Sequence, residues 1–167
     1  MSDRDDGDSH VLGPGLLPTP FTADEIRDAT GTGKTIRILI EEPDGTRFER
    51  VNRFSDCDAE GATLERWRAT LDGGVDGQVV SGRVTWLELQ WHAAFPAERT
   101  TVTEETLELP MGRLECVRYD TREGDVTDAP VESFWFARAF PGMPVRYESP
   151  TPAGIVRTTV VAVDVMR

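Results

Sequence analysis

From Thr35 onward, apolar and polar residues alternate with a period of two in short segments along the chain. This alternation is typical of β-strands that bury one face. Turn sequences such as Pro43-Asp44-Gly45-Thr46 separate the segments, and these connections are too short for parallel crossovers. The pattern therefore predicts successive antiparallel strands at residues 35–41, 47–56, 62–71, 100–109, 112–122, 132–140, 143–148 and 155–165. Asp76-Gly77 and Gly124-Asp125 are predicted to be breaks or loops between strands.

Two capping boxes predict short helices. Thr22 and Glu25 form the first, with Phe21 and Ile26 placed as a hydrophobic staple, and they predict a helix over residues 23–29. Thr85 and Glu88 form the second. They favour a helix within residues 85–95 that ends at Pro96, although a strand continuing from residue 84 is an alternative.

The predicted fold is mainly β (α+β). It is a single curved antiparallel meander sheet, or half-barrel, of about eight or nine strands, with one or two short helices packed on its concave face. Residues 1–20 are predicted to be a disordered acidic tail followed by an extended arm rich in proline and glycine, which Leu16 and Leu17 pin to the body. Residues 21–167 are predicted to form one β-rich domain.

The densest apolar run lies at residues 133–148 and is interrupted by a Pro-Gly-Met-Pro turn at 141–144. By alternation Phe134 and Phe136 share one face of their strand, while Trp135 and Ala137 share the other. Because both faces are apolar, the strand is expected inside the sheet and covered on both sides. The helix at 23–29, preceded by Phe21, is the best candidate for one of these covers.

The formal net charge of −12 argues against nucleic acid as a partner, because binding phosphate requires a basic surface. No apolar stretch is long enough for a signal peptide or a membrane span, so we predict a cytoplasmic protein without membrane insertion. Cys57 and Cys116 are then expected to be reduced thiols. The sequence leaves the oligomeric state open.

The segment Thr30–Thr35 ends in Gly-Lys-Thr like a phosphate-binding P-loop. However, Asp28 occupies the position of the first glycine, and a helix precedes the segment while a strand follows it, which is the reverse of a P-loop. We therefore interpret Lys34, the only lysine among the 18 basic residues, as an exposed residue of a glycine-rich turn.

Candidate catalytic groups are few. His92 is the only histidine in the predicted domain, and no nucleophile motif is present. Glu104, Glu105 and Glu108 on one strand, and the acidic turn at residues 56–60, are more readily explained as solvent-exposed surface than as acid–base or metal groups. We predict no catalytic residue, no metal site and no cofactor.

The C-terminal third carries Leu109-Pro110-Met111-Gly112, a strand ending in Cys116–Tyr119, and the turn Pro141–Arg146. Over residues 104–165 this pattern resembles the final strands of the outer-membrane lipoprotein carrier (LolA-like) superfamily. The resemblance implies a strongly curved antiparallel sheet that wraps around helices and shelters an apolar cavity. It transfers no binding residue, because none falls on a matching motif.

These observations leave two leading hypotheses and a weaker one. The first is a non-catalytic domain that binds an apolar or amphipathic small molecule in its curved sheet. The expected ligand-binding residues are the large apolar side chains Trp86, Trp91, Trp135, Phe140 and Met143. The alternative is a structural or protein–protein interaction module with a filled core, and the weaker hypothesis is a carboxylate-based hydrolase.

Overall fold

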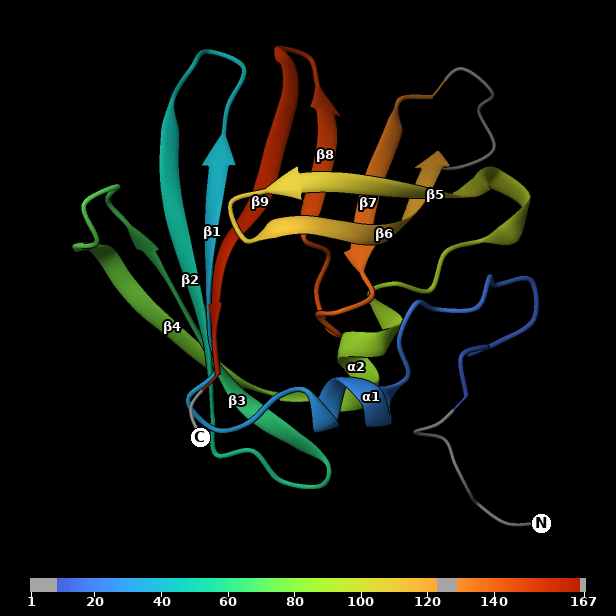
Figure 1. Ribbon diagram of the computed structural model, residues 1–167, viewed down its shortest axis with the longest axis horizontal. Coiled ribbons are helices and arrows are strands. Elements are labelled where there is room, and N and C mark those ends of the chain that lie inside the picture. The colour runs from blue at the N-terminus through green and yellow to red at the C-terminus, as the bar shows by residue number, and fades with distance from the viewer. Residues whose placement is uncertain (1–8, 123–128, 166–167) are drawn as a thin grey trace.

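In a computed structural model, which describes residues 9–122 and 129–165, the chain forms one nine-stranded antiparallel sheet and two short α-helices (Figure 1). The helices are α1 (Ala23–Asp28) and α2 (Trp86–Trp91), and a 3-10 turn, η1, covers Ala97–Arg99. The strands are β1 (Thr35–Glu41), β2 (Arg47–Ser55), β3 (Gly61–Ala69), β4 (Val75–Thr85), β5 (Thr100–Leu109), β6 (Gly112–Arg122), β7 (Val131–Ala137), β8 (Arg146–Thr151) and β9 (Gly154–Asp164).

The strand order is β4-β3-β2-β1-β9-β8-β7-β6-β5, so the sheet consists of two meanders joined where β1 pairs with β9. After β4 the chain passes through α2 and η1 to the opposite edge, and then returns strand by strand to the centre. The sheet is open, with β4 and β5 as its edges. The predicted fold, a curved antiparallel sheet with two short helices, is confirmed.

Both helices begin at the predicted capping boxes. The Thr22 hydroxyl accepts the Glu25 N–H at 3.1 Å, and the Glu25 carboxylate accepts the Thr22 N–H at 2.9 Å. Thr85 and Glu88 repeat this arrangement, so the segment that could have been a strand is a helix. Two satisfied backbone donors at each start explain why six-residue helices form at these positions.

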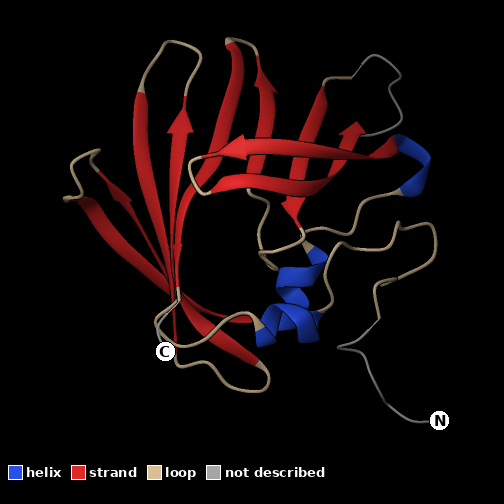
Figure 2. Cartoon of the chain, in the orientation of Figure 1, coloured by secondary structure: helices blue, strands red, loops and turns tan. Residues whose placement is uncertain are grey.

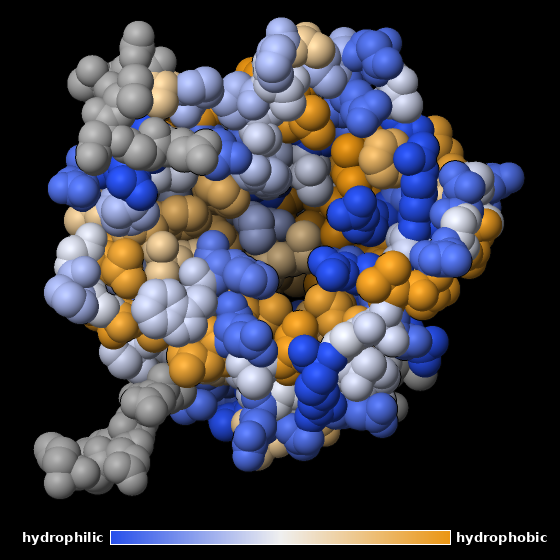
Figure 3. All heavy atoms as spheres, turned by 180° about the vertical axis from the view of Figure 1, so that it is seen from behind, coloured by the Kyte–Doolittle hydropathy of each residue, from blue (hydrophilic) through white to orange (hydrophobic). Residues whose placement is uncertain are grey.

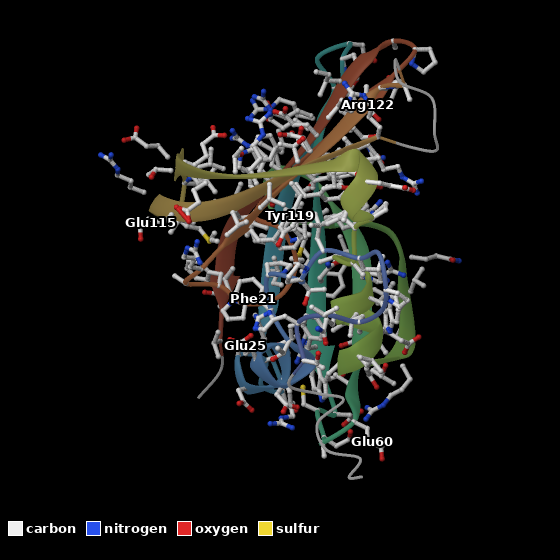
Figure 4. All side chains as sticks on the ribbon, turned by 90° about the vertical axis from the view of Figure 1, so that its right-hand side faces the viewer. Phe21, Glu25, Glu60, Glu115, Tyr119 and Arg122 are labelled. Carbon is white, nitrogen blue, oxygen red and sulfur yellow. The ribbon has the colours of Figure 1, made fainter. Side chains whose placement is uncertain are left out.

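The two helices lie together within the curve of the sheet (Figure 2). Phe21, which precedes α1, packs edge-on against Phe136 of β7, with the ring centroids 6.5 Å apart. Tyr119 of β6 packs against the same Phe136 ring at 5.7 Å. In Figure 4 Phe21 and Tyr119 lie in the interior, while Glu60, Glu115 and Arg122 lie at the periphery. The expected cover of one face of β7 by the α1 segment is therefore present.

The opposite face of β7 is covered by the other end of the sheet. The β5–β6 hairpin lies across β7, β8 and β9, and β5 contacts β9 (Figure 1). Trp135 is buried there, and its indole N–H donates to the Glu105 carboxylate of β5 at 3.2 Å. Buried side chains of β7 thus lie on both faces of the sheet, and they belong to one hydrophobic cluster.

Two local predictions were wrong. Asp76-Gly77 is part of β4 rather than a break, because Gly77 (φ +96°) lies opposite an irregularity in the β3 pairing and the strand continues beyond it. Phe140 and Met143 are not in strands but in the turn between β7 and β8. Pro141 and Pro144 have no N–H for a ladder, and Gly142 has φ +138°.

The described part of the arm, residues 9–20, packs along α2 and the segment that follows it. The Leu17 N–H donates to the Phe95 carbonyl at 2.8 Å, and Leu16 forms a β-bridge with Pro96. The side-chain amide of Gln90 in α2 also donates hydrogen bonds to the arm, one to the Ser9 carbonyl and one to the Thr19 hydroxyl. The tail predicted to be disordered spans residues 1–10, and its residues 1–8, like the turn predicted at Gly124-Asp125, lie outside the described residues. Ser9 and His10 are described, and the His10 carbonyl accepts the Thr19 N–H at 2.7 Å.

Candidate functional site

The concave face of the sheet and the two helices enclose a cavity of about 240 Å³. Strands β1, β2, β3 and β7, both helices and the Pro141–Pro144 turn contribute to its wall. Figure 3 shows the hollow from behind, with apolar and hydrophilic residues around it. Most of the lining is apolar: Phe21, Ile26, Ile36, Phe54, Leu64, Leu89, Phe134, Phe136 and Met143.

The turn at Pro141–Pro144 forms one end of this cavity. The Asn52 amide nitrogen of β2 donates a long hydrogen bond of 3.9 Å to the Met143 sulfur of this turn. A Cβ added to Gly142 would stand 4.0 Å from the Lys34 ammonium. The turn therefore brings apolar atoms and a bare glycine backbone against two polar side chains that are about a hundred residues away in sequence.

Lys34 is buried in the cavity wall, with 5% of its surface exposed. Its backbone is fixed between α1 and β1, because its N–H donates to the Gly31 carbonyl and its carbonyl accepts the Phe54 N–H at 2.9 Å. Gly33 (φ +94°) provides the reversal that turns the side chain inward. The interpretation of Lys34 as an exposed residue was therefore wrong.

No described carboxylate forms an ion pair with Lys34. Burial holds the pKa of Lys34 below its ordinary value of 10.5, and the neighbouring Cys57 opposes this shift. Two further polar groups belong to the same lining: Asn52, whose Oδ1 is buried without a hydrogen-bond partner among the described residues, and Arg66, which is exposed at the rim.

Replacing Lys34 with methionine is expected to raise the free energy of unfolding by about 1–3 kcal/mol near neutral pH, because it removes a buried charge without creating a void. In the wild type, the free-energy cost of burying the Lys34 charge is fully present below the pKa of Lys34 in the folded state. This cost decreases as the pH rises toward 10.5, the pKa in the unfolded state, because the folded state loses the proton first. Urea denaturation of both proteins from pH 7 to 10.5 should therefore show the advantage of the variant shrinking.

Arg113→Met, which removes an exposed positive charge from β6, is the matched control and should change stability by less than about 0.5 kcal/mol. A Lys34→Met variant that is less stable than wild type at every pH would mean that Lys34 has a counterion.

The structure places one of the five predicted ligand residues, Met143, in the cavity lining. Trp86 is buried and donates its indole N–H to the Asp58 carbonyl at 2.9 Å, while Trp91 on the same helix is 47% exposed. Trp135 lies on the opposite face of β7, and Phe140 packs partly buried in the turn. Ligand binding by these residues stays a prediction.

Sequence reasoning missed Lys34, Asn52 and Arg66. The available signal was compositional: one lysine occurs in a chain that otherwise uses arginine, and it lies in a turn between a helix and a strand. The observed order, α1 then β1, agrees with the rejection of a P-loop at this turn.

Glu104 and Glu105 line a small polar pocket, but each pairs with an arginine: Glu104 with Arg138 at 3.0 Å and Glu105 with Arg118 at 2.9 Å. Hydrogen bonds from Trp135 and Arg118 lower the pKa of Glu105 rather than raise it, which does not favour a general acid.

Glu104, Glu108 and the acidic residues of the 56–60 turn are exposed, and hydrogen bonds from the Gly61 and Glu60 N–H groups lower the pKa of Asp58 rather than raise it. Within the described residues no group of three or more His, Cys, Asp and Glu side chains is placed to hold a metal ion. His92 contributes to the cavity rim, and Cys57 and Cys116 are free thiols as predicted.

No family model matches the chain, and no curated protein matches it. Two solved structures are similar. One is a "putative exported protein with YmcC-like fold" from Bacteroides fragilis, with a TM-score of 0.46 and 11% identity over 81% of this chain and 97% of that chain. The other is a "putative lipoprotein" from Parabacteroides distasonis, with a TM-score of 0.45 and 9% identity over 81% of this chain and 96% of that chain.

These descriptions contradict the cytoplasmic location predicted from the sequence, since they name an exported protein and a lipoprotein. That prediction depended on the lack of an apolar stretch of signal-peptide length in the sequence. The resemblance to the lipoprotein carrier superfamily is not confirmed by any comparison. Among the described helices, none combines the length and apolar character needed to cross a bilayer.

Proposed function

We propose that the protein binds an apolar or amphipathic small molecule in the concave-face cavity and does not act on it chemically. The observation that carries the proposal is the cavity itself, which is unfilled by side chains and walled by aromatic and aliphatic residues. An apolar cavity of about 150 Å³ is enough to bind benzene, and this cavity is larger. The interaction-module alternative expects a filled core, and the open cavity supports the binding proposal over it.

The proposal is tested with N-phenyl-1-naphthylamine, a neutral dye whose fluorescence rises in apolar surroundings. We expect saturable binding to wild-type protein, weakened about tenfold or more by Leu64→Trp, which fills the cavity from β3. Val79→Trp on the exposed strand β4 is the matched control and should bind the dye like wild type. Circular dichroism melting shows whether each variant is folded.

Native mass spectrometry of protein purified from cells provides a second readout that requires no dye. Failure of the wild type to bind the dye, together with a spectrum free of adducts, would rule the proposal out. Equal dye binding by wild type and Leu64→Trp would place the binding site elsewhere.

A further inference from the structure

The cavity is not uniformly apolar: its polar groups gather where the Pro141–Pro144 turn meets β1 and β2. Lys34 is buried there without a described carboxylate partner, and Asn52 has a buried Oδ1 that no described group satisfies. A buried ammonium without a counterion is costly, and proteins normally pair such groups. A buried lysine without a described carboxylate partner and an unsatisfied amide oxygen on the same cavity wall therefore point to a ligand that pairs with them.

We propose that the ligand is a singly charged anionic amphiphile, such as a fatty acid, whose carboxylate binds the Lys34 ammonium while its chain occupies the apolar part of the cavity. This inference rests on the proposed function and adds the class of ligand. Asn52 can present either a donor or an acceptor to the head group, because rotating its amide exchanges oxygen and nitrogen. Arg66, exposed at the rim, is the second cation of the lining.

The charge of the whole protein makes a local cation necessary. A net charge of −12 repels anions, so an acidic ligand gains nothing from the overall field and must be attracted inside the cavity. Salt screens exposed charges beyond about 8 Å under physiological conditions, whereas a buried ammonium is screened much less. Lys34, the only lysine of the chain, supplies that attraction with a compact point charge.

One buried ammonium also limits the charge of the head group. A carboxylate carries a single negative charge, which Lys34 neutralises, whereas a phosphate monoester carries about −1.5 to −2 and would retain an unpaired charge inside the cavity. The remaining titratable groups of the lining, Arg66 and His92, lie on exposed residues at the rim. The geometry therefore favours a carboxylate.

The test compares ligands that differ only in the head group, by displacement of N-phenyl-1-naphthylamine at neutral pH. We expect wild-type protein to bind decanoate about tenfold more tightly than decanol, the scale of one charge-assisted hydrogen bond, and to bind decylamine least. In Lys34→Met the preference for decanoate over decanol should disappear. Arg113→Met, which makes the same change in net charge on the surface, should keep it.

The outcomes separate this inference from the proposed function. If decanoate and decanol bind equally well to wild type, or if Lys34→Met keeps the preference, the cavity binds ligands but the Lys34 assignment is wrong. If decyl phosphate binds more tightly than decanoate, the head group is not singly charged. If none of these amphiphiles displaces the dye and the dye itself does not bind, the proposed function fails and this inference fails with it.

Discussion

Replacing Trp135 with alanine is expected to lower the free energy of unfolding by about 3–5 kcal/mol, the range for removing a large buried aromatic side chain. Trp135 is 4% exposed and its side chain packs against residues of the β5–β6 hairpin. The Arg118 guanidinium stacks 4.7 Å from the centre of its ring, and its indole N–H donates to Glu105. The substitution therefore leaves a void and removes one of the two hydrogen bonds that Glu105 accepts, while the bond from Arg118 remains.

The Glu105 carboxylate connects Trp135 to its neighbours. The indole N–H, together with the Arg118 guanidinium at 2.9 Å, holds the pKa of Glu105 below its ordinary value. Losing the indole weakens the attachment of β5 to β7, and β5 is an edge strand whose only ladder partner is β6. The effect of the substitution is thus expected to extend to the whole hairpin.

Urea denaturation followed by circular dichroism measures this loss. Trp91→Ala is the matched control, because it removes the same side chain from an exposed position and should cost less than about 1 kcal/mol. If Trp135→Ala also costs less than about 1 kcal/mol, the β5–β6 hairpin does not pack over β7 as described. Dye binding distinguishes a change on one face of β7 from a change on the other, because Phe134 and Phe136 line the cavity and Trp135 does not.

What the sequence predicted well was local. A capping box involves residues three positions apart, so Thr22 with Glu25 and Thr85 with Glu88 predicted both helices correctly. Alternation is also a local pattern, because it compares neighbouring residues, and it predicted eight of the nine strands. Alternation did not predict β4, because both faces of this strand are exposed and its valines therefore do not mark a buried face.

The cavity depends on contacts that no local pattern contains. Lys34 lies in a glycine-rich turn, and it is buried only because β2, α1 and the distant Pro141–Pro144 turn surround it. The same limit applies to the tryptophans, since size alone predicted Trp86, Trp91 and Trp135 as ligand contacts. In the structure Trp86 is buried and donates to the Asp58 carbonyl, and Trp91 is exposed. Trp135 is buried outside the cavity lining.

The pairing of β1 with β9 is the longest-range feature of the fold. It brings together strands at opposite ends of the sequence and makes the centre of the sheet from the first and last strands. Alternation indicates that both strands have a buried face but says nothing about which strand each one pairs with. A simple meander in chain order satisfies the same pattern, and only the packing of helices and hairpin selects the observed order.

Gln90 is the second position where a single substitution is expected to have a large effect. It is 1% exposed, and its amide connects three segments: the oxygen accepts the Ala23 N–H of α1 at 2.9 Å, and the nitrogen donates to the Ser9 carbonyl at 2.7 Å and the Thr19 hydroxyl at 2.9 Å. Gln90→Leu nearly keeps the volume but removes all three of these hydrogen bonds.

We expect Gln90→Leu to lower the free energy of unfolding by about 2–4 kcal/mol, because each buried partner left unsatisfied costs about 1–3 kcal/mol and Thr19 keeps its bond to the Phe21 carbonyl. Gln78→Leu on the exposed strand β4 is the control and should change stability by less than about 0.5 kcal/mol. Hydrogen exchange should be faster at the Ala23 amide in Gln90→Leu alone. Unchanged exchange at Ala23 would mean that α1 is held by its capping box rather than by Gln90. In that case the wall of the cavity formed by α1 would stay in place without the arm.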